Sequence, residues 1–216
     1  MKKNLFTLST LVLLAASVTF TSCKKEDNTP PDVTLNGSDE TISLQSNYVD
    51  KGATAKDSKD GTISPTMSGN VDVNHTGVYP IVYTATDAAG NSSTATRNVT
   101  VVNDLDAMTG VYTCVINPGA YTYTQTIAAS TTVNRRLSFS KFGDYSNNTA
   151  IYADVTNTGA TSPINLPSQT AIQVGSPAAD RTFSGTGSRT TGGLTLTYTE
   201  VTTGGGGTYT EVFSKQ

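Results

Sequence analysis

Few side chains in this sequence are of the types that catalyse reactions. The only histidine, His75, lies in an expected loop before Gly77, where a solvated side chain is more common than a general base. Cys114 lies in the apolar stretch 113–116, and no basic residue adjoins it to lower the pKa of its thiol. A zinc site needs several His or Cys ligands, and the chain has one His and two Cys. We therefore expect neither nucleophilic catalysis nor a zinc centre.

Two glutamates are the candidates for paired-carboxylate chemistry. Glu200 and Glu211 fall on neighbouring expected strands, and glycoside hydrolysis uses two carboxylates that flank a cleft. We interpret both as solvated side chains on the outer face of a hairpin. The glycines at 204–207 lack the Lys-Ser/Thr pair and the helix of a phosphate loop, so they predict a hairpin loop. The expectation is a protein that is not an enzyme and has no cofactor.

Aspartates are the weak candidates for a metal site. Asp57, Asp60 and Asp87, together with Asp50, could supply the oxygen ligands that calcium prefers. Asp60 precedes a glycine, however, and Asp87 begins the stretch DAAGN, which are patterns that turns require. No loop has the dense ligand spacing of an EF-hand. We interpret these residues as turn formers and keep calcium as the lesser alternative.

Tyrosines are the candidate ligand-binding residues, because the chain has no Trp to stack on sugar rings. Two of them, Tyr121 and Tyr123, are two positions apart on an expected strand, so their rings share a face. The other interpretation is that tyrosine occurs here for its strand propensity and cross-strand packing. The candidate set is Tyr121, Tyr123, Tyr145 and Tyr152.

Cys23 has the most specific predicted chemistry. Residues 1–22 have the layout of a signal peptide, with a basic start, the apolar run 5–18 and small residues before the cysteine. This apolar run is shorter than the about 20 residues of a membrane-spanning helix. The cut site resembles a bacterial lipobox, although Phe20 stands where that motif usually has Leu. The resemblance implies a covalent lipid of the palmitate type on Cys23, and so a membrane anchor.

A tether follows the cysteine. Residues 24–31, KKEDNTPP, are charged and then proline-rich, without apolar periodicity, which predicts extended backbone. One interpretation is a solvated spacer. The other is an export signal, because the charged start resembles the signal that sends lipoproteins of Bacteroidota to the outer face of the cell. We expect an outer-membrane location that faces the cell exterior.

The composition indicates an all-β protein. Only 14% of the residues are charged, and Thr, Ser, Gly and Val are abundant, which suits strands and turns. The net charge of −3 argues against nucleic acid as a partner, because that ligand needs a clustered basic face. A lipid on Cys23 leaves Cys114 without a disulfide partner.

Residues 32–103 form the first expected domain. Period-two alternation, for example at Tyr79, Ile81 and Tyr83, predicts half-buried strands, and Asn-Gly, Asp-Gly and Gly-Asn pairs separate them. Six or seven short strands predict a small antiparallel sandwich. Tyr79, two residues after Gly77, resembles a tyrosine corner, whose hydroxyl holds a neighbouring loop.

Five blocks in this domain occur in a fixed order and resemble the bacterial Ig-like domain first described in a pesticidal crystal protein. They are Pro31-x-Val33-x-Leu35-x-Gly37, Tyr48-Val49-Asp50-x-Gly52, Asp60-Gly61-x-Ile63, Tyr83-Thr84-Ala85-x-Asp87-x-x-Gly90-Asn91 and Arg97-x-Val99-x-Val101. The resemblance implies a spacer or adhesive module without catalytic residues.

Residues 108–216 form the second expected domain, after the short acidic junction 104–107 that places the two domains end to end. Eight strand-like runs separated by short turns predict an antiparallel eight-stranded up-and-down barrel or a compact sandwich. The expected runs are 111–116, 121–127, 136–140, 150–155, 171–174, 182–184, 194–200 and 208–213.

Gly110-x-Tyr112 resembles the Gly-x-Trp motif that opens the first strand of lipocalin-like proteins. Further blocks resemble the small C-terminal β domains of Bacteroidota lipoproteins, which often lie beside glycan-uptake machinery. These are Ile164-x-Leu166-Pro167-x-Gln169-Thr170, Phe183-Ser184-Gly185-x-Gly187 and Leu194-x-Leu196-x-Tyr198.

The sequence therefore predicts a surface lipoprotein that binds a polysaccharide or a protein partner, together with outer-membrane transport proteins. Two alternatives stay open. One is a structural or adhesive surface protein with the Ig-like domain as spacer. The other is a barrel that holds a small apolar ligand.

Overall fold

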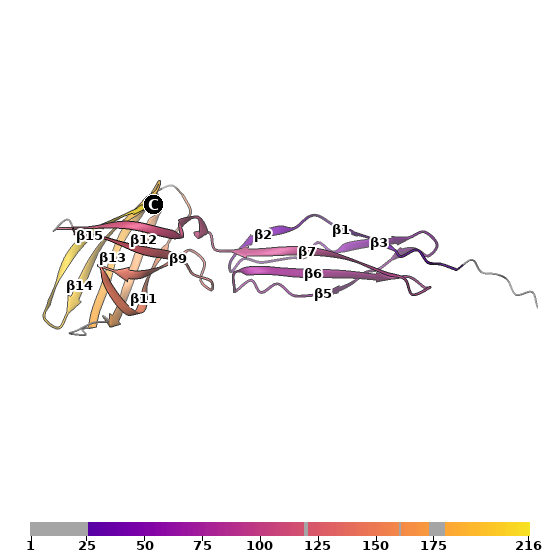
Figure 1. Cartoon of the computed structure of the whole chain (residues 1–216), viewed down its shortest axis with the longest axis horizontal. Helices are drawn as coiled ribbons and strands as arrows, with labels where there is room; N and C mark the ends of the chain where they lie inside the picture. The colour runs from indigo at the N-terminus through magenta and orange to yellow at the C-terminus, as the bar shows by residue number, and fades with distance from the viewer. Residues whose placement is uncertain (1–25, 119–120, 160, 173–179) are drawn as a thin grey trace, which may run out of the picture.

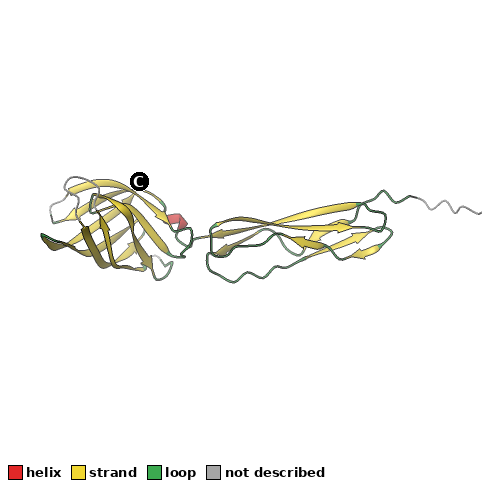
Figure 2. Cartoon of the chain, turned by 90° about the horizontal axis from the view of Figure 1, so that it is seen from below, coloured by secondary structure: helices red, strands yellow, loops and turns green. Residues whose placement is uncertain are grey.

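The structure is a computed structural model that describes residues 26–118, 121–159, 161–172 and 180–216. Over these ranges the chain forms two β domains placed end to end, with the first described residues at one extremity and the second domain at the other (Figure 1). The only helical element described is a single 3-10 turn between the domains (Figure 2). The all-β prediction is confirmed. Among the described residues, no helix has the length and hydrophobicity to cross a membrane.

The first domain is a sandwich of two sheets, as predicted. One sheet has the order β1-β3-β4 and the other the order β2-β7-β6-β5. The strand bounds are β1 Asp32–Leu35, β2 Glu40–Ser43, β3 Ala53–Asp57, β4 Gly61–Ile63, β5 Thr66–Ser68, β6 Gly77–Thr86 and β7 Ser92–Val102. Their alternating side chains bury Ile81, Tyr83 and Val99 between the sheets.

One pairing in this sandwich differs from the antiparallel prediction. Strand β2 runs parallel to β7, with Glu40 opposite Val99. The first part of the chain pairs with β3 as β1, and the chain then crosses to the other sheet after Gly37, whose φ is +111°. A left-handed residue at this point is favourable only for glycine, so Gly37 permits the switch.

A buried arginine crosses the sandwich. The Arg97 side chain is fully buried, and its Nη1 lies 2.5 Å from Asp50 Oδ1. Nη2 donates to the backbone oxygens of Asn36 and Gly52, each at 3.1 Å. Tyr83 also donates a hydrogen bond to Asp50. These contacts join β7 to the loop before β3, so Asp50 has a structural role and the metal-ligand alternative is wrong for it.

The second domain is a closed eight-stranded up-and-down barrel, so the prediction is confirmed in its barrel form. Each strand pairs antiparallel with the next, and β15 pairs with β8 to close the sheet. The bounds are β8 Gly110–Asn117, β9 Tyr121–Ala129, β10 Arg136–Phe142, β11 Tyr145–Val155, β12 Pro163–Ile172, β13 Asp180–Thr190, β14 Gly193–Thr202 and β15 Gly205–Lys215. Closure removes the unpaired strand edges that promote aggregation.

The fifth barrel strand lies earlier than predicted. We expected 171–174, whereas β12 begins at Pro163, and residues 173–174 lie outside the described residues. The strand contains Pro167 and has a register shift between Leu166 and Gln169. Proline cannot donate to the sheet, so this stretch lacks the pattern of a regular strand although it forms one around a bulge.

Aromatic side chains fill the barrel. Phe142 lies 5.4 Å from Phe139 and 5.1 Å from Phe183, and Phe139 lies 5.6 Å from Phe213, all between ring centroids. Rings at these separations are in contact. These rings occupy the part of the interior that the structure describes, which counts against the alternative of a barrel that holds a small apolar ligand.

The end of the barrel next to the Ig-like sandwich is closed. Met108, in the 3-10 turn Asp106–Met108, is buried in the barrel core with Leu105. Tyr112 donates a hydrogen bond to the backbone oxygen of Met108 at 2.8 Å. Tyr79 donates in the same way to the oxygen of His75, four residues earlier, at 2.8 Å, which confirms the predicted tyrosine corner. Each Gly-x-Tyr motif thus secures the segment that enters its strand.

Candidate functional site

The linker between the domains is buried in polar contacts. Asn103 is 2% exposed, and its Nδ2 donates to the backbone oxygens of Ser130 at 2.8 Å and Val133 at 3.0 Å. Its Oδ1 accepts from the backbone N–H groups of Leu105 and Arg135. One amide side chain therefore fixes the β9–β10 loop of the barrel against the linker, because its donors and its acceptor are all used.

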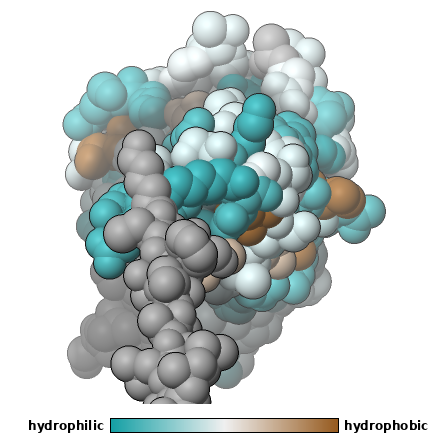
Figure 3. Space-filling view, turned by 90° about the vertical axis from the view of Figure 1, so that its right-hand side faces the viewer, coloured by the Kyte–Doolittle hydropathy of each residue, from teal (hydrophilic) through white to brown (hydrophobic). Residues whose placement is uncertain are grey.

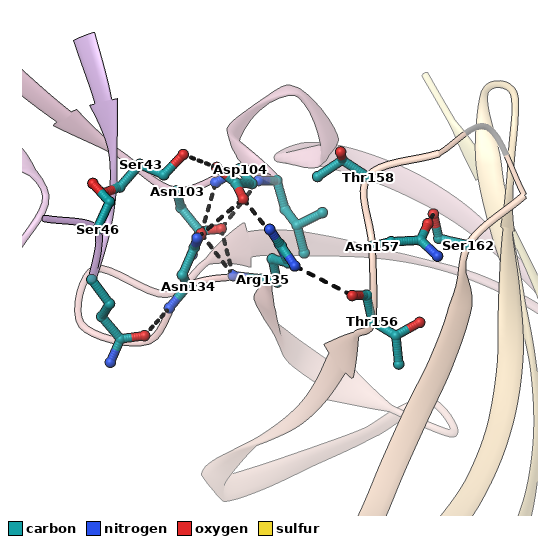
Figure 4. A network of polar contacts seen from close by, with 12 residues as sticks. Ser43, Ser46, Asn103, Asp104, Asn134, Arg135, Thr156, Asn157, Thr158 and Ser162 are labelled. Carbon is teal, nitrogen blue, oxygen red and sulfur yellow. Dashed lines mark hydrogen bonds and ion pairs between the residues drawn. The ribbon is translucent and has the colours of Figure 1, made fainter.

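The same loop also contacts the Ig-like domain (Figure 4). Asp104 accepts hydrogen bonds from Ser43 at 2.6 Å and from Arg135 Nε at 2.9 Å. The backbone N–H of Asn134 donates to Gln45 Oε1 at 3.0 Å, and that of Thr76 donates to the oxygen of Thr131 at 2.9 Å. The β9–β10 loop is thus held between both domains, and the junction has a defined geometry.

The other end of the barrel, where β9 begins at Tyr121 and β14 ends at Thr202, faces away from the Ig-like domain; we call it the distal end. Tyr121 is 55% exposed there, and its hydroxyl lies 2.6 Å from Asp144 Oδ2. This hydrogen bond raises the pKa of Tyr121. Arg181, at the start of β13, forms an ion pair with Glu200 near the end of β14. The distal end therefore combines an exposed ring with charged side chains.

A polar cluster lies inside the barrel below this end. The carboxylate of Glu211 is fully buried and accepts a hydrogen bond from Tyr123. Gln125 Nε2 lies 3.3 Å from the Tyr123 hydroxyl and 3.5 Å from Cys114 Sγ. Burial raises the pKa of Glu211 to about 7, and it raises that of Cys114 to about 12. Burial and the nearby Glu211 also raise the pKa of Tyr123.

The interpretation of both glutamates as solvated is wrong. Glu200 is 6% exposed and Glu211 is fully buried, because both point into the barrel. The signal was present in the alternation: Glu200 is in phase with Leu196 and Tyr198, and Glu211 is in phase with Phe213. Strand phase, and not position in the hairpin, decides where these two side chains lie.

The predicted tyrosine set does not form one surface. Tyr121 and Tyr123 share the inner face of β9, but Tyr123 is only 7% exposed, so the expected exposed pair is wrong. Tyr152 is half-buried beneath the Arg136 guanidinium, which lies 3.8 Å from the centroid of its ring. Tyr145 begins β11 opposite Phe142, and its side chain is outside the described set. Of the four, Tyr121 alone is described with an exposed ring.

The aspartates lie at the opposite extremity of the molecule, where the tether meets the Ig-like domain. Asp57 and Asp87 come together with Asp27, a tether residue, and their candidate ligand atoms all lie within 4.8 Å of one another. We call these three residues the acidic cluster. Asp60 is not part of it and accepts a hydrogen bond from the backbone N–H of Ala88 at 2.7 Å.

Both Ig-domain members of the acidic cluster also cap turns. The Asp57 Oδ1 atom accepts from the backbone N–H groups of Asp60 and Lys59, and these bonds lower its pKa. Burial alone would raise the pKa of Asp87, but hydrogen bonds from Asn91 outweigh it and lower the pKa. The turn-forming role is therefore confirmed. Asp27 had no local signal, because its neighbours in space are 30 or more positions away in the sequence.

Cys23, the predicted lipidation site, lies outside the described residues, as do residues 1–25 as a whole. The described chain begins within the predicted tether at Glu26, at the extremity farthest from the barrel (Figure 1).

Comparison with known proteins identifies the first domain. Residues 33–101 match the family described as "Bacterial surface protein, Ig-like domain". No curated protein matches the chain. Because the family is one of bacterial surface proteins, the match supports a location at the cell surface.

Two solved structures are similar in part. The lipoprotein BT2262 from Bacteroides thetaiotaomicron is 18% identical with a TM-score of 0.32, over 86% of this chain and 100% of that one. A structure of CBM51-2 in complex with GlcNAc and INT domains from Clostridium perfringens ZmpB is 21% identical with a TM-score of 0.28. It covers 53% of this chain and 30% of that one. Both TM-scores are low, so the identification rests on the family match: residues 33–101 are a bacterial surface Ig-like domain, and a closed eight-stranded barrel follows it.

Proposed function

We propose that this protein is a non-catalytic, lipid-anchored surface protein whose Ig-like domain presents the barrel to a polysaccharide or a protein partner. The anchor is Cys23 in the outer membrane, and the partner belongs to a nutrient-uptake system at the cell exterior. One observation carries the proposal: the tether and the distal end of the barrel are at opposite extremities of a chain whose junction is fixed by hydrogen bonds.

The fixed junction supports a presenting role. Asn103 and Asp104 use their side chains to hold both domains. The Ig-like domain therefore sets the orientation of the barrel as well as its distance from the tether. A flexible linker would allow the barrel to fold back towards the membrane. A spacer of defined length instead keeps the distal end exposed to large ligands.

The distal end is the part of the barrel with the best features for binding. Tyr121 offers an exposed ring, and its bond to Asp144 holds the hydroxyl in place. Aromatic rings with a fixed polar edge suit both sugar faces and protein hot spots.

The buried glutamates support a non-catalytic function. Glu200 is paired with Arg181, and Glu211 is hydrogen-bonded to Tyr123 inside a packed core. A glycosidase acid and its partner carboxylate must flank a space that admits the sugar. These side chains instead bind neighbouring residues of the barrel, Arg181 and Tyr123.

The test is binding by the full mature chain on arrays of plant, host and microbial polysaccharides, with a parallel pull-down from outer-membrane extract. Tyr121→Ala should abolish or reduce binding by about ten-fold or more, as for an interface hot spot. Tyr152→Ala, on the outer barrel wall, is the matched control and should bind as the parent does. Loss of binding in the control with retention in Tyr121→Ala would move the site away from the distal end.

The second candidate is an adhesive surface protein in which the Ig-like domain makes the contact. An open groove of about 440 Å³ on that domain favours it, and the groove is lined in part by Tyr48 and Met67. Met67 is 56% exposed, and Val49, next to Tyr48 in the chain, is 81% exposed. Met67→Ser should then weaken adhesion to host or microbial surfaces, whereas Tyr121→Ala should leave it unchanged.

A further inference from the structure

The Asp57 carboxylate has an atom that the fold does not use. Asp57 is 2% exposed, and its Oδ2 has no hydrogen-bond partner in the described structure. Oδ1 already serves the turn, with the backbone N–H groups of Lys59 at 2.7 Å and Asp60 at 2.8 Å. A buried carboxylate oxygen without a partner is costly, so such an atom requires an explanation.

The surroundings of this oxygen favour a positive partner. Asp87, which is also buried, and Asp27 place their oxygens within 4.8 Å of the Asp57 carboxylate. Three carboxylates at this separation repel one another unless a cation lies between them. Hydrophilic residues gather on the visible part of this end of the molecule, among neutral residues and a few hydrophobic ones (Figure 3).

We propose that Asp27, Asp57 and Asp87 bind a calcium ion that fastens the tether to the end of the Ig-like domain. This site goes beyond the proposed presenting function and does not depend on the partner of the barrel.

The donor set favours calcium over magnesium. The three carboxylates come from separate segments of the chain, and calcium accepts oxygen ligands in flexible, irregular geometry. Magnesium demands near-ideal octahedral geometry and gives up its bound water reluctantly, so it suits such a site less well.

A lysine now contributes part of the positive charge. Lys59 Nζ lies 3.3 Å from Asp27 Oδ1 and 3.0 Å from the backbone oxygen of Glu26. Its single charge does not balance three carboxylates, and the side chain is 42% exposed, so it can move aside. Lys59 is therefore a competitor for the ion, and its removal should tighten calcium binding.

The tether is already held close enough for the site to form. Asn91 Nδ2 donates to the backbone oxygen of Asp27 at 2.9 Å and to Asp87 Oδ2 at 2.8 Å. Ser93 donates to the oxygen of Pro31 farther along. Calcium would add side-chain ligation to this backbone contact, and the chain would leave the membrane in a fixed direction.

The experiment is calcium titration of the mature chain carrying Cys23→Ser, by calorimetry and by thermal unfolding after chelation of metals. We expect a Kd of about 0.1–1 mM, as for extracellular calcium modules. At about ten times the Kd, the Tm of the Ig-like domain should rise by about 6–11 °C. Magnesium at the same concentration should give a much smaller rise.

Three variants make the test specific. Asp27→Asn, which lies on the tether and outside the folded sheets, should weaken calcium binding about ten-fold or more. Lys59→Met should strengthen it. Asp72→Asn, an acidic residue of the same domain that pairs with His75, is the control and should bind as the parent does.

Either of two results would overturn calcium binding at this site. One is no heat and no change in Tm up to about 10 mM calcium, which is above the range of extracellular modules. The other is unchanged binding in Asp57→Asn, a variant that retains the Oδ1 acceptor of the turn. Unchanged binding in Asp27→Asn with loss in Asp57→Asn would contradict the fastening of the tether.

Discussion

The hydroxyl of Ser43, at the end of the Ig-like sandwich, donates a hydrogen bond of 2.6 Å to the carboxylate of Asp104 in the linker. The same carboxylate accepts from Arg135 of the barrel at 2.9 Å. Burial opposes ionisation of Asp104, but these donors outweigh it, and the pKa is lowered. One ionised side chain therefore connects both domains.

Asp104→Ala should loosen the junction without unfolding either domain. The change removes the contacts to Ser43 and Arg135, whereas the Asn103 contacts stay in place. We expect a broader distribution of interdomain distances by double electron–electron resonance, with one spin label in each domain. Asp39→Ala, at an exposed loop of the Ig-like domain, should leave the distribution as narrow as in the parent. Identical distributions for Asp104→Ala and the parent would show that Asp104 does not fix the geometry.

Glu211 should make the barrel less stable as the pH rises. Its pKa is about 7 in the folded chain, against an ordinary value of 4.5, so the folded state favours the protonated form. The stabilisation is fully present below pH 4.5 and is lost as the pH passes through about 7. The shift corresponds to about 3 kcal/mol. The measurement is urea unfolding of the parent and of Glu211→Gln at pH 5 and pH 8, which gives the change in the free energy of unfolding between the two pH values.

Glu211→Gln keeps the size of the side chain and removes the titration. Its free energy of unfolding should differ little between the two pH values. Equal pH dependence in the parent and this variant would place the effect on another group.

Asp50→Ala should destabilise the Ig-like domain strongly. It leaves the buried Arg97 guanidinium without its carboxylate partner, which costs about 3 kcal/mol for a buried pair. Asp32→Ala, at an exposed position of β1, should stay within about 0.5 kcal/mol of the parent. Guanidinium unfolding followed by tyrosine fluorescence provides the comparison.

The ion pair of Asp50 and Arg97 should also make the stability of the Ig-like domain sensitive to acid. Burial opposes ionisation of Asp50, but hydrogen bonds from Tyr83 and Gly52 lower its pKa below 3.8. The stability that this gives is present above pH 3.8 and is lost as the pH falls through the folded value. Asp50→Ala should show less of this loss than the parent.

Cys114 should resist alkylation in the folded protein. The thiol is fully buried, and its pKa of about 12 leaves almost no thiolate at neutral pH. Iodoacetamide followed by mass spectrometry should label Cys114 only after denaturation. Rapid labelling of the folded chain would mean that the barrel opens at this strand.

Strand alternation predicted the architecture because each domain buries one face of its strands. Leu194, Leu196 and Tyr198 are buried in turn, and the run they form was predicted as a strand. The position of β12 was not predicted, because Pro163 and Pro167 mask its pattern. The closed sheet accommodates Pro167 because the hydrogen-bond register of β12 shifts between Leu166 and Gln169.

The candidate sites were harder to predict than the architecture, because they form through contacts between residues that are distant in the sequence. Asp27 joins the acidic cluster through residues 30 and 60 positions later, and a local pattern contains no record of such a contact. Glu211 could have been placed from its phase with Phe213. Asn103 has no pattern of its own, since its role comes from the β9–β10 loop that folds back onto it.

We propose that Cys23 anchors the chain and that the Ig-like domain holds the barrel outside the cell. The most direct measurement is staining of intact cells with an antibody against the barrel, combined with membrane fractionation of the parent and Cys23→Ser. We predict that the parent stains intact cells and sediments with outer membranes, whereas Cys23→Ser is folded and soluble. Sedimentation of Cys23→Ser with outer membranes would contradict the anchor, and staining of the parent only after the cells are opened would contradict the exterior location of the barrel.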